Sequence, residues 1–386
     1  MHFSAVSVND ALYAQKLYFK HMKPAYKVWI EIRKKAVKNN VATFRAVLGA
    51  KTKLYAVVKS NAYGHGLTLF SGLADACGVD GFCVDSVVEG AKLRVHGILK
   101  PILVLGYTLP GLFSEAKKHG IAITVSSKES LAAILKAGDD APNFHIKIDT
   151  GMHRQGLQPE EVPGVIRRLY KLKAKSSFTG LYTHFAMAKN RKDTAFTDRQ
   201  LAAFRSACAS FEQEGFSGLM RHASATGGAL LGEKYHMDMA RIGIGLYGIW
   251  PSAELERQLG KKIVLHPALS LHSVISEKKT VAKGEGVGYD MTEVMKKPTD
   301  IAIVPVGYWH GIPRTASSVG SAHVGPSAAR IVGRVSMDMI MIDVTGIPCR
   351  VGSEAVISPV SLAQAMGASP YEVVTRINPL IHKAVI

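Results

Sequence analysis

A lysine ends an apolar, strand-like run in the stretch YAVVKSNAYGHG, residues 55–66. If the chain passes from a strand into a loop here, the amine of Lys59 stands at the strand end, and apolar surroundings would favour its neutral form, a nucleophile and a base. The common alternative is a lysine that points into solvent, because most lysines are exposed. Taken alone, Lys59 does not identify a site.

Other strand-like runs also end in residues that can do chemistry. They are Asp149, with Arg154 beyond it, in KIDTGMHRQG; His184 in LYTHFAMA; Thr226 in HASATGG; and Arg241, with Gly243 and Ile244, in MARIGIGLYG. Thr226 and the two glycines after it suit a phosphate, because small residues let backbone N–H groups approach an anion. Together with a lysine, a histidine and two arginines, such a loop predicts pyridoxal 5′-phosphate held as a Schiff base.

These residues can meet only if the strands that carry them share one sheet edge. Eight β-rich runs alternate with helix-like segments, at residues 54–59, 81–86, 101–107, 121–126, 144–149, 177–184, 219–224 and 241–247. Eight such units predict a closed (β/α)8 barrel of the TIM type, whose active site lies at the C-terminal ends of the strands. An open, doubly wound sheet is the alternative, although no GxGxxG follows the first strand.

The character of the chain changes after the barrel runs, because alternating and β-branched segments then follow without long helices between them. We therefore expect three parts: an N-terminal extension over residues 1–25, a cofactor-binding barrel over 26–256 and a mainly β domain over 257–386. The run YKVWIEI, residues 26–32, could pair with either domain.

Several motifs together resemble those of bacterial alanine racemases. The stretch AVVKSNAYGHG resembles their cofactor-attachment motif, and seven further motifs match in the same order over about residues 24 to 376: KIDTGMHRQG, LYTHFA, DMARIGIGLYG, GEGVGYD, VGYWHGIPR, GRVSMDMIMIDV and YEVVT. The order of eight motifs makes the resemblance specific. It implies a homodimeric isomerase that interconverts L-alanine and D-alanine and supplies D-alanine for peptidoglycan.

The resemblance also implies a role for individual residues. Lys59 would be the Schiff-base lysine and the base on one face of the substrate, and Tyr289 the second base, contributed by the partner subunit to a shared active site. Arg241 would contact the pyridine nitrogen, and His184 would lie between Tyr289 and Arg241. The residues that bind the cofactor phosphate would be Tyr63, Thr226, Gly243, Ile244 and Tyr371. The residues near the substrate carboxylate would be Arg154, Met337 and Asp338. Lys147 would be the lysine that many members carry as a carbamate.

The chain departs from the family where many members read GYADG, because it reads GYWHG. Trp309 and His310 would therefore alter the expected substrate entrance. The alternatives that remain are a racemase of another small amino acid such as serine and a decarboxylase on the same barrel and cofactor. A cofactor-free lysine aldolase would leave Thr226 unexplained, and a non-enzymatic protein would leave Tyr289 unexplained.

Composition narrows the class of protein further. The chain has 386 residues, is 47% hydrophobic and carries a formal charge of +18, but its basic residues are dispersed and lack the aromatic interleaving typical of a nucleic-acid surface. Four scattered cysteines predict neither disulfides nor a metal site. With no apolar run long enough for a signal peptide or a membrane span, we expect a cytoplasmic protein that binds no nucleic acid and no membrane.

Overall fold

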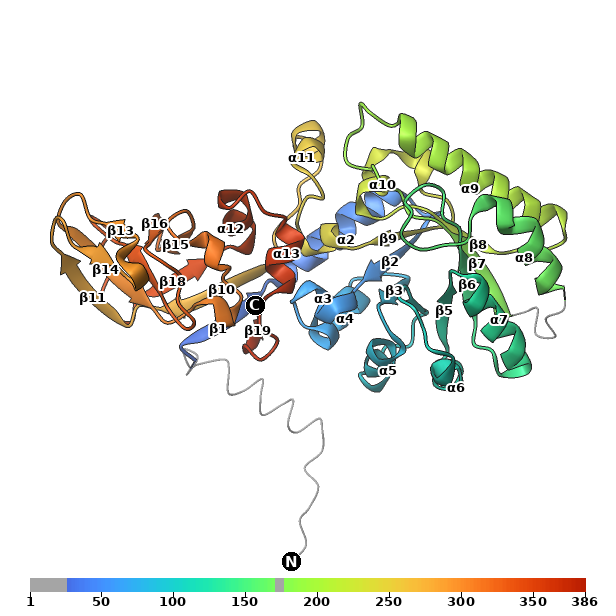
Figure 1. Cartoon of the computed structure of the whole chain (residues 1–386), viewed down its shortest axis with the longest axis horizontal. Coiled ribbons are helices and arrows are strands. Elements are labelled where there is room, and N and C mark those ends of the chain that lie inside the picture. The colour runs from blue at the N-terminus through green and yellow to red at the C-terminus, as the bar shows by residue number, and fades with distance from the viewer. Residues whose placement is uncertain (1–25, 171–176) are drawn as a thin grey trace, which may run out of the picture. The chain divides into compact units, whose positions relative to one another are not determined.

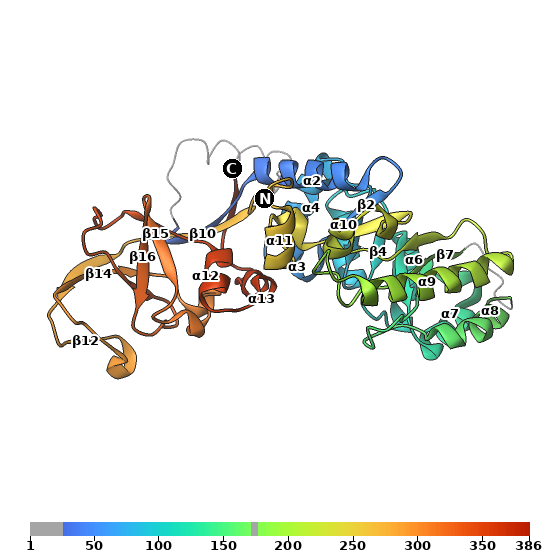
Figure 2. The same ribbon diagram turned by 90° about the horizontal axis from the view of Figure 1, so that it is seen from above.

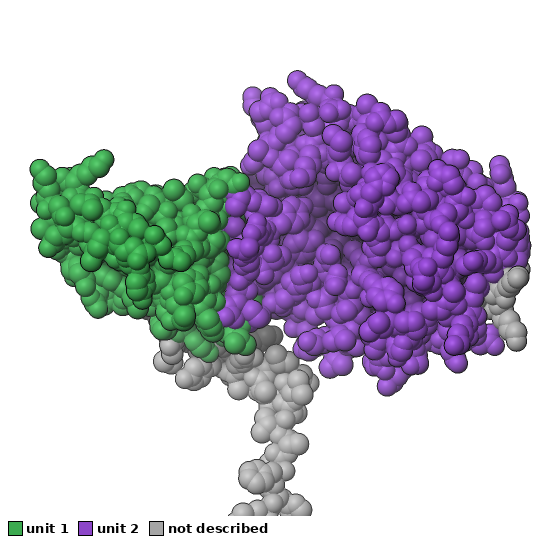
Figure 3. All heavy atoms as spheres, viewed as in Figure 1, with its two compact units in different colours: residues 1–31, 270–367, 380–384 green, residues 32–269, 368–379, 385–386 purple. Residues whose placement is uncertain are grey.

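The computed structural model describes residues 26–170 and 177–386, so the predicted N-terminal extension lies outside the described residues. The chain forms two compact units, coloured separately in Figure 3. Of the described residues, the barrel unit comprises 32–170, 177–269, 368–379 and 385–386, and the sheet unit comprises 26–31, 270–367 and 380–384.

The barrel unit is built on eight parallel strands in the order β8-β7-β6-β5-β4-β3-β2-β9. The strands are β2 (Lys53–Val57), β3 (Gly81–Val84), β4 (Ile102–Val104), β5 (Ile121–Val125), β6 (Phe144–Lys147), β7 (Phe178–Tyr182), β8 (Met220–His222) and β9 (Met239–Ile242). A parallel bridge between Ala225 and Arg241 joins the two ends, which makes the barrel nearly closed. The prediction of a (β/α)8 barrel is confirmed, and each strand falls within or beside its predicted run.

Helices lie between the barrel strands along the chain and outside them in space, as Figures 1 and 2 show. They are α2 (Lys34–Leu48), α3 (Lys59–Tyr63), α4 (Leu67–Ala76), α5 (Val87–Val95), α6 (Phe113–Lys118), α7 (Lys128–Ala137), α8 (Val162–Leu169), α9 (Ala195–Gln213), α10 (Thr226–Leu231), α11 (Ala253–Leu259) and α13 (Pro370–Thr375). Of these, α2 precedes β2, α11 follows β9 and α13 comes from the late segment 368–379. The hydroxyls of Ser86 and Ser127 accept backbone N–H groups at the starts of α5 and α7. Such caps satisfy donors that a helix start leaves free, so these helices begin directly after a strand end.

The barrel interior is filled by side chains that alternate along the strands. Tyr55 and Val57 of β2 pack with Cys83, Leu103 and Met239 from the neighbouring strands. This apolar layer lies below the strand ends, so polar side chains that follow the strands gather above a solid core.

The sheet unit contains nine strands in the order β11-β14-β17-β16-β15-β18-β10-β1-β19. They are β1 (Val28–Ile32), β10 (Leu269–Val274), β11 (Glu277–Val281), β14 (Thr299–Val304), β15 (Ser321–Val324), β16 (Ser327–Val332), β17 (Ile340–Asp343), β18 (Glu354–Ile357) and β19 (Lys383–Val385); a hairpin of β12 (Gly286–Val287) and β13 (Glu293–Val294) and the helix α12 (Pro359–Ala365) complete the unit. The run over residues 26–32 therefore pairs with the later β domain. The predicted mainly β character of that domain is confirmed.

Across the two described ranges, no helix is both long enough and apolar enough to cross a membrane.

Candidate active site

A cavity of about 470 Å³ opens at the C-terminal ends of the barrel strands. Ten of the thirteen residues predicted for the site line it: Lys59, Tyr63, Lys147, Arg154, His184, Thr226, Arg241, Gly243, Ile244 and Tyr371. The barrel therefore brings together residues spread over more than 300 positions of sequence. Another cavity, of about 390 Å³, lies beside the first residues of β2 and β8 and contains none of them.

Lys59 opens a turn with unusual backbone geometry. The four residues after it, Ser60 to Tyr63, all have φ between 50° and 56°, a left-handed conformation that L-residues adopt at a cost of roughly 1–2 kcal/mol each. Asn61 stabilises the turn, because its Oδ1 accepts the N–H of Leu67 at 2.9 Å. The turn carries the Tyr63 ring toward β9, where its hydroxyl lies 3.0 Å from the position that a Cβ on Gly243 would take.

The end of the cavity near Thr226 is made of small and uncharged groups. The buried hydroxyl oxygen of Thr226 accepts the N–H groups of Gly243 and Gly245 at 3.1 and 3.3 Å. A Cβ on Gly227 would lie 2.2 Å from the carbonyl oxygen of Ala188, so only glycine fits there. The rings of Tyr63 and Tyr371 also line the cavity, and their centroids lie 6.0 Å apart. Burial raises the pKa of Tyr63 to about 12, so its hydroxyl remains a hydrogen-bond donor.

Arg241 is one of the largest fully buried side chains. It donates to the carbonyl oxygens of Thr183 and Ala223 at 2.8 and 2.9 Å, and also to Nδ1 of His222 and, at 3.3 Å, to Nδ1 of His184. Burial, reinforced by the Arg241 charge, lowers the pKa of both histidines, which keeps them neutral acceptors. The guanidinium is held rigidly, and its remaining donors can serve a ligand in the cavity.

A chain of imidazoles continues behind Arg241. Nε2 of His222 and Nδ1 of His145 lie 2.8 Å apart, and burial lowers the pKa of His145 to about 3. Because Nδ1 of His222 accepts from Arg241, its Nε2 carries the hydrogen and donates to His145. The tautomers along this chain are therefore determined by the arginine.

Lys147 and Arg154 form the cationic side of the cavity. Burial and then the Arg154 charge lower the pKa of Lys147 to about 8, and its Nζ donates to Oε1 of Gln155 at 3.3 Å. The loop that carries Arg154 is shaped by Asp149, whose Oδ1 accepts the N–H groups of residues 151, 152 and 153 at 2.9–3.1 Å. Asp149 therefore shapes the loop, although it follows a strand as several of the residues that line the cavity do.

Charge in the cavity is strongly unbalanced. Among the described lining residues there are four cations, Lys59, Lys147, Arg154 and Arg241, and one carboxylate, Asp85. The cavity therefore suits an anionic ligand. Asp85 and Gln155 are not among the predicted site residues; Asp85 lies near the end of the predicted run over residues 81–86, so the strand-end rule that found Lys59 could have found it.

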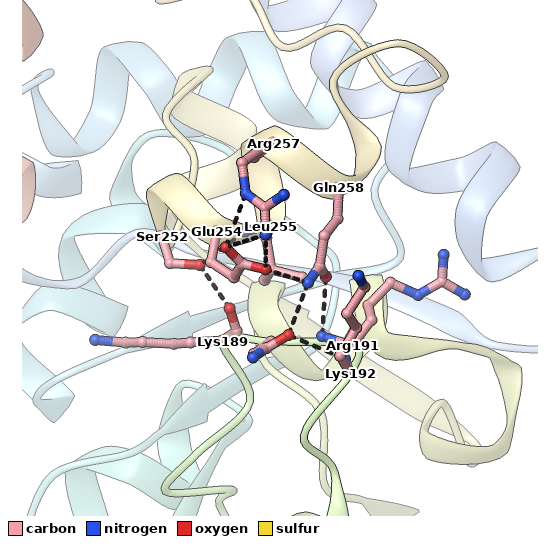
Figure 4. Close-up of polar contacts among 9 residues, drawn as sticks. Lys189, Arg191, Lys192, Ser252, Glu254, Leu255, Arg257 and Gln258 are labelled. Carbon is pink, nitrogen blue, oxygen red and sulfur yellow. Dashed lines mark hydrogen bonds and ion pairs between the residues drawn. The ribbon is translucent and has the colours of Figure 1, made fainter.

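The loop after β7 continues from His184 toward α11, and Figure 4 shows the contacts that hold it. The hydroxyl of Ser252 donates to the carbonyl of Lys189 at 2.8 Å, and Oε1 of Gln258 accepts the N–H of Arg191 at 3.0 Å. Nε2 of Gln258 also donates to Oδ1 of Asn190 at 2.7 Å. Because Ala188 of this loop lies against Gly227, the bracing by α11 extends to the small-residue end of the cavity.

The other three predicted residues belong to the sheet unit. Tyr289 begins a turn between β12 and β13 and is 67% exposed, while Met337 and Asp338 are exposed in the loop between β16 and β17. In the same unit His310 is buried and its Nδ1 accepts the N–H of Gly307 at 3.1 Å, whereas Trp309 is exposed. The histidine of the GYWHG motif thus stabilises its own turn.

Comparison with known proteins points to one family. The chain matches the alanine racemase N-terminal domain over residues 32–251 and the alanine racemase C-terminal domain over residues 268–385. It is 35% identical over 383 residues to the alanine racemase of Leptospira interrogans serogroup Icterohaemorrhagiae serovar copenhageni, covering 95% of this chain and 97% of that protein. It is 33% identical over 374 residues to that of Desulforamulus reducens, covering 93% and 99%.

Solved structures agree with this result. The alanine racemase of D-cycloserine-producing Streptomyces lavendulae has a TM-score of 0.86 at 33% identity, over 94% of this chain and 98% of that one. The alanine racemase of Bacillus anthracis with bound L-Ala-P has a TM-score of 0.85 at 31% identity, over 94% and 96%.

Proposed function

This chain belongs to the alanine racemase family, and we propose that it interconverts L-alanine and D-alanine in the cavity at the mouth of its barrel. One observation carries the proposal: Lys59, the buried Arg241 and a cradle of small residues line the same cavity. The cradle consists of Thr226, Gly227, Gly243 and Ile244. Pyridoxal 5′-phosphate has one partner for each of these features: an aldehyde, a ring nitrogen and a phosphate group. The family relation and the cavity thus support the same reaction.

We propose pyridoxal 5′-phosphate as the cofactor. The excess of cations suits its negative charge, and the absence of a side chain at Gly227 and Gly243 leaves backbone within reach of a phosphate beside Thr226, Ile244, Tyr63 and Tyr371. When bound, the cofactor supplies an electron sink that makes the α-proton of an amino acid removable. The residues present fit the group.

The residues of this chain would then hold it and move the protons. Lys59 would bind the aldehyde carbon covalently and carry a proton to and from one face of the substrate α-carbon. Arg241, which is charged and only a donor, would point its free N–H toward the ring nitrogen and keep that nitrogen unprotonated. This restrains the electron sink and disfavours side reactions such as transamination. A decarboxylase on this barrel would be expected to carry an acid in place of Arg241.

The second proton would come from Tyr289. Racemisation needs a base on each face of the α-carbon, and we propose that Tyr289 of a partner subunit serves the opposite face in a homodimer with shared sites. His184, bonded to Arg241, would stabilise the phenolate. Arg154, Met337 and Asp338 would lie around the cofactor oxygen and the substrate carboxylate, and Arg154 would supply the positive charge for that carboxylate.

We further propose a cytoplasmic enzyme whose D-alanine is used in cell-wall peptidoglycan. The family relation and the lack of a membrane-spanning helix within the described residues are consistent with this assignment.

Borohydride reduction of the purified protein tests the assignment of the site. We expect the reduced cofactor to be attached covalently to Lys59, as read by peptide mass spectrometry, because Lys59 stands in the cavity wall next to the cradle. Lys59→Ala should lose the label, and Lys100→Ala, which removes a lysine paired with Asp75 outside the cavity, should keep it. A label on any other lysine would refute the assignment.

A further inference from the structure

The lysine at the barrel mouth has an acidic neighbour. Oδ1 of Asp85 lies 3.5 Å from Nζ of Lys59, and both side chains line the cavity. Among the described lining residues Asp85 is the one carboxylate beside four cations. Asp85 forms its ion pair with Lys59 and not with the buried cations Lys147 and Arg241, and this choice of partner calls for a structural explanation.

One side chain connects the loops that carry this pair. Oε2 of Glu89, in the first turn of α5, accepts the N–H of Asp85 at 2.8 Å, and Oε1 of the same carboxylate accepts the N–H of Asn61 at 3.4 Å. Asn61 lies in the left-handed turn that Lys59 opens. Glu89 therefore links the loop after β2 to the loop after β3 through two hydrogen bonds.

Gly106, at the end of a third strand, packs directly against Asp85. A Cβ on Gly106, which follows β4, would lie 2.2 Å from the carbonyl oxygen of Asp85 and 3.3 Å from its Cγ. Any side chain at position 106 would displace Asp85. Three successive strand ends thus cooperate to place one carboxylate beside one amine.

We propose that Asp85 is a positioning residue for Lys59. It holds the amine toward the reacting position whenever the amine is not bonded covalently. This rests on the proposed function: when Lys59 takes the α-proton, the C–H bond breaks, an N–H bond forms, the electron pair stays on the substrate, and the amine that carries the proton lies beside the Asp85 carboxylate. An attraction between partly exposed groups favours the paired position of the amine over the unpaired one about two- to fivefold.

The test measures the reactivity of Lys59 in the full chain freed of cofactor by dialysis against hydroxylamine. An amine held in an ion pair is less available to acetic anhydride than a free one, so Asp85→Asn should raise the acetylation rate of Lys59 about two- to fivefold, measured by peptide mass spectrometry. Gly106→Ala, which displaces Asp85 without removing a charge, should act in the same direction. Circular dichroism verifies that the variants are folded.

Asp75→Asn is the matched control, because it removes the carboxylate 2.9 Å from Lys100 in another Lys–Asp pair. It should raise the acetylation of Lys100 and leave Lys59 unchanged. The proposal is overturned if Lys59 reacts at the wild-type rate in both Asp85→Asn and Gly106→Ala while Lys100 responds to its own variant. Because this assay needs no cofactor, its failure is distinct from a failure of the borohydride experiment.

Discussion

At the scale of single residues, the cavity places two amines in different surroundings. Lys59 is partly exposed and faces a carboxylate, whereas Lys147 is 4% exposed and faces Arg154 and an amide. Burial and the Arg154 charge lower the pKa of Lys147 to about 8, so a sizeable share of it is neutral near neutral pH. Carbon dioxide adds only to a neutral amine, which makes Lys147 suited to the carbamate that the family resemblance implies.

We therefore expect a carbamate on Lys147 whose occupancy rises with pH through about 8 at a fixed pressure of carbon dioxide. The sign follows from the lowered pKa: below it the ammonium form prevails and cannot react, and above it the amine is free. Carbon-13 NMR in labelled bicarbonate measures the signal, and Lys147→Met should abolish it. Absence of the signal at every pH would show that Lys147 carries no carbamate and that its amine keeps the contact with Oε1 of Gln155.

At the scale of elements, the cradle depends on a close approach between α10 and the loop after β7. That loop is held by α11 through Ser252 and Gln258, and its Ala188 carbonyl lies where a side chain on Gly227 would stand. The cradle is therefore formed by packing between two segments, and a single methyl group should disturb it.

Gly227→Ala is expected to lower the affinity for pyridoxal phosphate about tenfold or more and to destabilise the fold by about 1–3 kcal/mol, because the new Cβ would overlap Ala188. Fluorescence titration and urea unfolding measure the two effects. Gly72→Ala, in the middle of α4, is the control, because its Cβ would meet no atom within 4 Å. This variant should leave the free energy of unfolding unchanged or raise it by about 0.5–1 kcal/mol. Unchanged cofactor affinity in Gly227→Ala would show that the cradle lies elsewhere.

At the scale of the whole molecule, the two proposed bases belong to different compact units. Lys59 lies in the barrel unit and Tyr289 in the sheet unit, 230 positions later. In a two-fold dimer of the proposed kind, each site would draw one base from each chain. The proposed division of the chain at residue 257 stays a prediction.

Mixed dimers test this arrangement. Lys59→Ala and Tyr289→Phe homodimers should each be nearly inactive, because each lacks one base at both sites. A heterodimer of the two has one site with both bases intact, so it should recover about half the wild-type rate if the sites act independently. A heterodimer verified by native mass spectrometry that stays inactive would place both bases in one chain.

The sequence by itself determined the barrel and, by their place after strand-like runs, seven of the ten residues that meet in the cavity: Lys59, Arg154, His184, Thr226, Arg241, Gly243 and Ile244. It could do so because strand periodicity is local and because parallel strands in a barrel all end at one face. The family resemblance alone predicts Tyr63, Lys147 and Tyr371. The tertiary structure decided what these patterns do not contain: the left-handed turn over Ser60 to Tyr63, the tautomers behind Arg241, the strand partners of residues 28–32 and the pairing of Asp85 with Lys59. Those features depend on distances between groups far apart in the chain. In the sequence, a carboxylate that shapes its own loop, as Asp149 does, has the same pattern as one that lies beside a lysine, as Asp85 does. Only the packing of the folded chain distinguishes the two roles.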